Sequence, residues 1–174
     1  MAAYTTIDNP ELYFQAKIYS GDGNDNRSIT FDGSEDMQPD IVWINERNTT
    51  SGHVIYDSER GASEFLFPYS TRNRETSTAR FKSFDSDGFT VGTSGASNGS
   101  SDTYVAWCWK ESATAGMDIV LYTGDGSSRT ISHSLSAVPD WMIVKNREFD
   151  PSDVANGTNW DVWHSSLTAT SGNN

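Results

Sequence analysis

The sequence has few of the residues on which several protein classes depend. It contains one cysteine, Cys108, among 174 residues, so it forms no internal disulfide and offers no cysteine pair to a metal. A cysteine of this kind is usually a small buried apolar residue. No run of about eighteen apolar residues is present and no charged, apolar and small-residue signal opens the chain. We therefore expect that the protein is made in the cytoplasm and is not inserted into a membrane.

Basic residues are also scarce. Twelve Lys and Arg face 24 Asp and Glu, which gives a net charge of −12 and a pI near 4.4. Such a charge repels a phosphate backbone unless a basic patch opposes it locally. The one basic cluster is diluted by Ser, Thr and Glu75, and its members are Arg72, Arg74, Arg80 and Lys82. We expect no binding of nucleic acid.

Aliphatic residues and helix signals are sparse, and aromatic rings take their place. Only 35% of residues are hydrophobic but 12% are aromatic, so a few large rings must provide most of the burial. Short aromatic and β-branched segments are separated by clusters of Gly, Asn, Asp and Ser, which predicts strands joined by turns. The predicted strands are 13–20, 28–31, 40–46, 53–58, 64–67, 80–84, 88–92, 103–110, 117–123, 129–133, 140–146 and 161–165.

The segment "TYVAWCWK" (103–110) indicates how these strands pack. Alternation places Val105 and both tryptophans on one face, and Tyr104, Ala106 and Cys108 on the other. Both faces are apolar, which is typical of a central strand. The sequence therefore predicts an all-β fold, an antiparallel β-sandwich of the jelly-roll or lectin-like kind.

Part of the sequence occurs twice. "IYSGDG" (18–23) returns as "LYTGDG" (121–126), and Arg27 and Ile29 return as Arg129 and Ile131. "MQPDIVWINERN" (37–48) matches "AVPDWMIVKNRE" (137–148), with Pro39, Asp40 and Arg47 meeting Pro139, Asp140 and Arg147. "HVIYDS" (53–58) then matches "WDVWHS" (160–165). The offset changes only at loops, as expected for two copies of one fold.

This pattern predicts one complete repeat and part of a second. The predicted divisions are an N-terminal arm at 1–13, a first β-sandwich at 14–110, a linker at 111–116 and a partial second repeat at 117–174. The second repeat lacks counterparts of "SFDSDGF" and "YVAWCWK", which would leave strand edges open. We therefore expect the natural chain to continue beyond Asn174.

No constellation of polar residues indicates catalysis or a metal site. "DGNDN" (22–26) resembles a calcium loop, but Arg27 and Gly33 stand where an EF-hand needs Gly and a carboxylate. His53, His133 and His164 are not at ligand spacing, and no serine lies in a nucleophile elbow. The recurring Asp22, Asp40, Asp125 and Asp140 are best explained as turn residues. We expect no enzyme activity, no cofactor and no metal.

Three aromatic residues are candidates for stacking on sugars: Tyr56, Trp160 and Trp163. A sandwich with few aliphatic residues needs its rings inside, so the core is the favoured place for them.

Beyond these features, the chain resembles a known group of proteins. The ordered set "PDIVWINERN", "YDSERG", "SFDSDGFTVG" and "DTYVAWCWK" is similar to a repeated domain of virion and tail-fibre-like proteins from tailed phages of marine cyanobacteria and related marine bacteria. The opening "MAAYTTIDNPELYF" resembles the starts of such proteins, which indicates a true N-terminus. "WINERN" departs from this pattern, because Glu46 separates Asn45 from Arg47 whereas Asn146 adjoins Arg147. The resemblance implies a particle protein but no catalytic residues.

We therefore expect a phage structural protein, the N-terminal part of a tail fibre or similar appendage that supports host attachment. Its partners would be other virion proteins. We also expect a homo-oligomer, a trimer, because association would bury apolar faces that a core with few aliphatic residues leaves exposed. The arm would attach to the particle through Tyr4, Ile7, Pro10, Leu12 and Tyr13. Two alternatives are a lectin-like module that binds host-surface polysaccharide and, more weakly, a polysaccharide-degrading enzyme.

Overall fold

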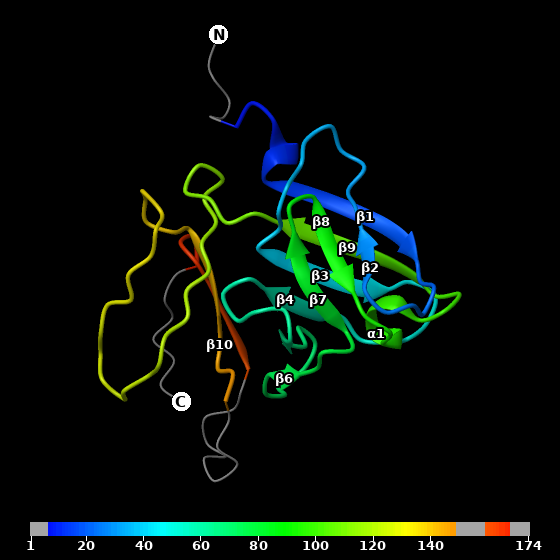
Figure 1. The fold of residues 1–174 in the computed structure, drawn as a ribbon. Coiled ribbons are helices and arrows are strands. Elements are labelled where there is room, and N and C mark those ends of the chain that lie inside the picture. Colours follow the sequence, from blue (N-terminus) through cyan, green and yellow to red (C-terminus); the bar gives the residue numbers. More distant parts are fainter. Residues whose placement is uncertain (1–6, 149–158, 168–174) are drawn as a thin grey trace.

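Two antiparallel sheets form the main body of the molecule in the computed structural model, which describes residues 7–148 and 159–167. The larger sheet has the order β1 (Phe14–Ser20), β9 (Thr103–Trp109), β3 (Ile41–Glu46) and β4 (Val54–Asp57). The smaller has the order β2 (Arg27–Ile29), β8 (Gly88–Val91) and β7 (Phe81–Asp85). Figure 1 shows the smaller sheet in front of the larger one. The predicted all-β, antiparallel sandwich is confirmed.

The remaining elements are short. A one-turn 3-10 helix, η1, covers Pro10–Leu12, and a one-turn helix, α1, covers Gly95–Asn98. Two further pairs of strands are β5 (Glu64–Phe65) with β6 (Glu75–Thr76), and β10 (Trp141–Lys145) with β11 (Trp160–His164). We call residues 14–110 the first unit and the β10–β11 pair the hairpin.

β9 is the central strand of the larger sheet, as its sequence predicts. It pairs along its whole length with β1 and along all but one residue with β3. Tyr104, Ala106 and Cys108 are fully buried between the sheets, and burial raises the pKa of the Cys108 thiol. The two β9 tryptophans lie on the other, half-buried face.

Aromatic rings fill the space between the sheets. Tyr56 stacks on Phe81 with ring centroids 4.5 Å apart, and Phe81 stacks on Phe89 at 5.6 Å. Tyr19 stacks on Tyr104 at 5.1 Å. Each such ring removes a large apolar surface from water, worth about 2 kcal/mol. The low aliphatic content is thus compatible with a well-packed core.

The outer face of the larger sheet carries a second aromatic group. Trp43 donates its indole N–H to Nδ1 of His53 at 2.9 Å, and the imidazole lies parallel to Trp107. The three residues come from β3, the loop before β4, and β9. His53 therefore has a structural role, that of accepting a hydrogen bond from a half-buried tryptophan.

Some predicted strands are shorter than expected and two are absent. The expected strands at 28–31 and 64–67 are represented by the shorter β2 and β5. The prediction of strands at 117–123 and 129–133 is wrong, because these residues make only an isolated bridge between Ser112 and Met117. Strands require partners, and the partners of the matching β1 and β2 are β9 and β8. No counterpart of β9 or β8 lies in the described part of the chain.

The loops at one end of the sandwich meet at Asn98, the last residue of α1. Its buried amide nitrogen lies within hydrogen-bonding distance of Asp22 Oδ1, the Asn24 carbonyl and the Gly92 carbonyl, and its oxygen accepts from the Asp22 N–H and from Arg27. Gly21 is needed beside it, because a Cβ there would lie 2.1 Å from the carbonyl oxygen of Gly99. This explains the glycine that opens the first "GDG"; at Gly124, which opens the second, a Cβ would meet nothing within 4 Å.

We predict that Asn98→Ala destabilises the first unit by about 3 kcal/mol, because it leaves several buried hydrogen-bonding groups without partners. Chemical denaturation followed by tryptophan fluorescence measures the change. Asn24→Ala is the matched control, since the Asn24 side chain is exposed and only its backbone carbonyl meets Asn98. Equal stabilities of the two variants would contradict the assignment of Asn98 as the residue that ties these loops together.

Candidate functional site

The hairpin has the same register as β3 and β4. In the first unit Ile41 pairs with Asp57 and Val42 with Tyr56. In the hairpin Trp141 pairs with His164 and Met142 with Trp163, which are the positions that the sequence match equates. The hydrogen bond from Ser58 N–H to the Asp40 carbonyl also returns, as Ser165 N–H to the Asp140 carbonyl at 2.8 Å.

The β3–β4 pair and the hairpin differ sharply in the burial of their side chains. Val42, Ile44 and Tyr56 are fully buried in the first unit. Their counterparts Met142, Val144 and Trp163 are 41%, 40% and 41% exposed. Trp141, Ile143 and Val162, on the opposite face, are also exposed. The hairpin is therefore an apolar ribbon with both faces in contact with water, the kind of surface that marks an interaction site.

The "GDG" turns also share their local geometry. The Asp22 carboxylate accepts from the Asn24 N–H, and the Asp125 carboxylate accepts from the Ser127 N–H, both at 2.9 Å. Gly23 and Gly126 have φ of +73° and +76°, a conformation that glycine adopts readily. Arg129 donates to the Thr123 carbonyl, as Arg27 does to that of Ser20.

These similarities concern turns and one hairpin, so the division of the chain into two repeats stays a prediction. The aspartates behave partly as expected. Asp22 and Asp125 hold their own turns, but Asp40 reaches further: its carboxylate accepts from the Ser58 hydroxyl and from the Glu111 N–H. No donor contacts the carboxylate of Asp140 within the described residues.

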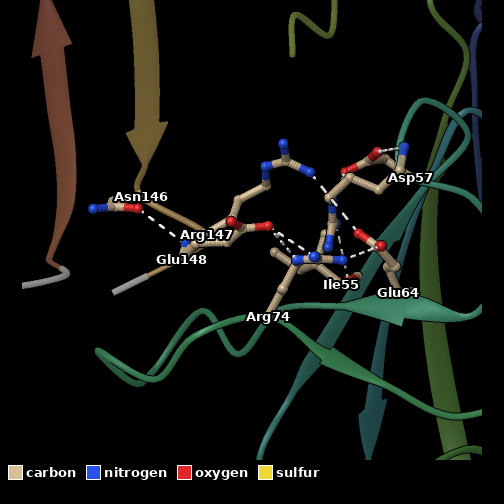
Figure 2. A network of polar contacts seen from close by, with 8 residues as sticks. Ile55, Asp57, Glu64, Arg74, Asn146, Arg147 and Glu148 are labelled. Carbon is tan, nitrogen blue, oxygen red and sulfur yellow. Dashed lines mark hydrogen bonds and ion pairs between the residues drawn. The ribbon is translucent and has the colours of Figure 1, made fainter. Parts of the chain in front are cut away.

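The hairpin meets the first unit through a polar junction, shown in Figure 2. The Arg74 guanidinium lies between the carboxylates of Glu64 and Glu148, the latter 2.7 Å away. Arg147 extends toward Glu64 from the other side, 3.8 Å from its carboxylate. The Arg74 N–H donates to the Arg147 carbonyl at 3.0 Å. The junction thus joins the residues after β10 to the β5–β6 region.

The same junction contains a shallow hollow of about 430 Å³. Its lining consists of charged and small polar side chains: Asn73, Arg74, Glu75, Thr76, Arg147 and Glu148. Arg74 pairs with Glu148 across the hollow, and the other lining charges pair with residues beside it, Glu75 with Arg72 and Arg147 with Glu64. The hollow therefore differs from the mostly apolar pocket that is typical of a small-molecule site.

Lys145 of β10 donates from its ammonium group to the Thr71 carbonyl at 3.3 Å, and Trp160 provides a further attachment of the hairpin. Its indole N–H lies 3.1 Å from the Phe67 carbonyl and 3.2 Å from that of Ser70. Trp160 and Trp163 are three residues apart on one strand, so they face opposite sides and form no common platform. Tyr56 is fully buried, which removes it from the candidates for stacking on sugars. Of the three, Trp163 alone is exposed.

Between the first unit and the second "GDG" turn lies a pair of carboxyl groups. Glu111 and Asp118 are hydrogen-bonded to each other, which raises the pKa of Glu111 to about 7 and lowers that of Asp118. Asp118 also accepts from the Ser134 N–H at 2.6 Å. Below pH 7 the pair holds one proton, on Glu111, and Asp118 connects this part of the chain to residue 134.

The predicted arm is partly fixed to the first unit. Asn9 caps η1, and the Glu11 carboxylate accepts from both the N–H and the hydroxyl of Ser34 at 2.8 Å. Of the proposed attachment residues, Pro10 and Leu12 are exposed whereas Ile7 and Tyr13 are half-buried. Tyr4 lies outside the described residues.

The remaining candidates have structural partners. His133 and His164 each accept from a backbone N–H two residues ahead. In the "DGNDN" turn Asp25 pairs with Lys82. Arg80, from the basic cluster, lies over the Phe65 ring. Among the described residues no three His, Cys, Asp or Glu side chains are grouped to hold a metal ion. Nor does that part of the chain contain a helix that could span a membrane.

Comparison with protein families gives one match, which runs from residue 9 to 174 and is described as Domain of unknown function (DUF7483). The chain belongs to the DUF7483 family. The match begins at the cap of η1 and includes the first unit, the linker and the hairpin together. No curated protein and no solved structure matches this DUF7483 chain.

We predict that Trp160→Phe loosens the hairpin from the first unit by about 1 to 2 kcal/mol, because phenylalanine cannot donate to the Phe67 and Ser70 carbonyls. Hydrogen exchange of β10 and β11 measures the loss. Trp163→Phe is the control, since no described residue accepts a hydrogen bond from Trp163. Equal exchange in both variants would show that these hydrogen bonds do not hold the hairpin.

We also predict a pH-dependent linker. The pKa of Glu111 is raised in the folded protein, so the stabilisation that its protonated form gives is complete below its ordinary pKa and is lost as the pH rises through about 7. The pKa of Asp118 is lowered, so the stabilisation that its ionised form gives is lost as the pH falls. Protection of the Ser134 N–H from hydrogen exchange, corrected for intrinsic rates, should therefore fall between pH 5 and 8.

The variant Glu111→Gln tests the cause, because an amide donates to Asp118 at every pH. It should keep Ser134 protected at pH 8. Glu59→Gln serves as the control, since Glu59 acts on Glu111 only through its charge. A wild-type protection factor that does not change between pH 5 and 8 would refute the prediction.

Proposed function

We propose that this chain is a structural protein of a phage virion, part of a tail fibre or similar appendage that anchors to the particle and supports host attachment. One observation carries the proposal: a closed sandwich is followed by a hairpin with the same register whose faces are open. A chain built in this way can be extended by adding units along its length, as appendages require. The resemblance of its motifs to tail-fibre-like proteins agrees with this architecture.

Surface charge and the arm give further support. A net charge of −12 keeps proteins soluble at the high local density of a particle. Pro10 and Leu12 lie exposed on a turn that is itself fixed by Glu11 and Ser34, so they present a defined apolar contact for another virion protein. The exposed hairpin faces suit a homo-oligomer, which we propose to be a trimer.

The proposal predicts that the chain is a component of purified particles. An antibody raised against it should label an appendage in immunogold electron micrographs of particles from the native source, and chemical cross-linking of those particles should give a trimer. Antibody absorbed beforehand with the pure chain is the control. A chain found only in the soluble fraction of the lysate, with particles unlabelled, would contradict the assignment.

The two alternatives have distinct readouts. A lectin-like module would bind host-surface polysaccharide through exposed Trp163, and the Trp163→Ala variant would lose that binding. A polysaccharide-degrading enzyme would release reducing ends from it. The appendage proposal requires neither result.

A further inference from the structure

Among the described residues, one edge of the hairpin is unpaired, whereas the corresponding edge of the β3–β4 pair in the first unit is paired with β9. In the first unit the order β1-β9-β3-β4 places β9 between β1 and β3. The sequence match equates β1 with 117–123, β3 with β10 and β4 with β11. In the described part of the chain no strand lies between 117–123 and β10. Figure 1 shows residues 117–135 as a long loop without sheet pairing.

Both sides of this position expose apolar side chains. Val120, Leu121 and Tyr122 are 39%, 39% and 45% exposed, whereas Tyr19, the counterpart of Tyr122, is 7% exposed. On the other side Ile143 is 45% exposed. A strand in the β9 position would cover Tyr122, because Tyr19 is buried against Tyr104 of β9 in the first unit. Ile18, the counterpart of Leu121, is 61% exposed there, so Leu121 would lie on the outer face.

Main-chain groups on the open edge of β10 are directed outward. Asp140 bonds to the β11 side, because its carbonyl accepts from the Ser165 N–H. Successive residues of an antiparallel strand direct their N–H and C=O groups to opposite edges, so the main-chain groups of Met142 and Val144 also bond to β11. The N–H and C=O of Ile143 therefore face the open edge. Val162, which lies opposite Ile143, directs its own groups to the far edge of the hairpin, as its counterpart Ile55 does toward Leu66.

Asp140 adds a marker of register. In the first unit the Asp40 N–H donates to the carbonyl of Trp109, the last residue of β9, and the Asp40 carboxylate accepts from the Glu111 N–H. Asp40 thereby fixes where β9 ends. Asp140 keeps the bond to Ser165, while its carboxylate has no donor within the described residues.

We propose that residues 117–123 and β10 form an acceptor slot for one antiparallel β-strand with the alternating aromatic pattern of Thr103–Trp109, carried on another segment of a DUF7483 polypeptide. The strand would pair with β10 on one edge and with 117–123 on the other, and Asp140 would fix its end. Its large side chains would lie opposite Trp141 and Ile143, and its small ones opposite Met142 and Val144. Main-chain pairing supplies affinity and side-chain alternation supplies specificity in strand addition.

The slot is independent of the virion assignment. Strand binding tests the hairpin alone, whereas particle labelling tests the location of the protein, so either result can fail while the other stands. The occupant is a strand of the β9 kind instead of a second hairpin, because only the former reproduces both the register of β3 with β9 and the two hydrogen bonds of Asp40.

The probe is a fluorescent peptide with the sequence of residues 102–111, carrying Cys108→Ser, and the receptor is the full 174-residue chain. Fluorescence anisotropy should show saturable binding, and a scrambled peptide of the same composition should not bind. Ile143→Pro should weaken binding about tenfold or more, because it removes an outward N–H from the receiving edge.

Val162→Pro is the matched control. It is also an exposed residue of the hairpin, and proline is tolerated where the N–H points away from a paired strand. It should leave peptide binding unchanged, and circular dichroism of both proline variants reports whether the sheet is retained.

Asp140→Ala tests the register. It should weaken the 102–111 peptide about fivefold through loss of the bond to the Glu111 N–H, and have a smaller effect on an amidated peptide that ends at Trp109. Hydrogen exchange should show new protection at Ile143 and at 120–122 when the longer peptide binds.

Several results would overturn the proposal. These are absence of saturable binding, equal binding of the scrambled peptide, and loss of binding in Val162→Pro but not in Ile143→Pro. A dimer formed by the pairing of two β10 edges, detected by sedimentation and dissociated by Ile143→Pro, would also overturn it, because a strand without the alternating pattern of Thr103–Trp109 would then occupy the edge of β10.

Discussion

The structure depends on the pairing of β9 with a strand at each edge. β9 pairs seven residues with β1 and six with β3, so it turns three separate segments of the chain into one sheet. Its inward side chains, Tyr104, Ala106 and Cys108, are buried and form part of the aromatic core. Where β9 pairs, Val42, Ile44 and Tyr19 are buried, and β1 is a strand. Strand content and burial in the first unit therefore have a common origin in this ladder.

The second half of the chain shows what happens where that ladder is absent. Segment 117–123 is the part of the chain that the sequence match equates with β1, with Tyr122 in the place of Tyr19, but it forms no strand. The hairpin still forms, because β10 and β11 are partners to each other and their register follows from local alternation. The "GDG" turns form in both halves because Asp125, like Asp22, bonds to an N–H two residues away. The turns and the hairpin form without a counterpart of β9 among the described residues, whereas the segment that would need such a strand as its partner, 117–123, does not become a strand.

This distinction decides how much could be predicted from the sequence. Alternation in "TYVAWCWK" and the turn residues were enough to predict an antiparallel sandwich with a central strand at 103–110. The same rules predicted strands at 117–123 and 129–133, and failed there because propensity does not supply a partner. The role of Asp40 was also missed, since a local turn was expected and its acceptor bonds reach Ser58 and Glu111. The recurrence of Pro-Asp before both β3 and β10 was the available signal.

Electrostatic contacts within the molecule determine where the basic residues lie. Each cation of the 72–82 cluster has a near partner: Arg72 pairs with Glu75, Arg74 with Glu64 and Glu148, and Lys82 with Asp25, while Arg80 lies over Phe65. In a chain of net charge −12, cations placed in this way reduce repulsion between neighbouring carboxylates and hold loops together. Arg74 does both, because it joins Glu64 in the first unit to Glu148 beyond β10. The polar contacts thus attach the hairpin at the β5–β6 side, where β11 meets the loop 67–70 through Trp160. Since attachment uses the end of β10 and the Trp160 side of β11, it leaves the main-chain groups of Ile143 free, and an added strand need not displace any contact that holds the hairpin.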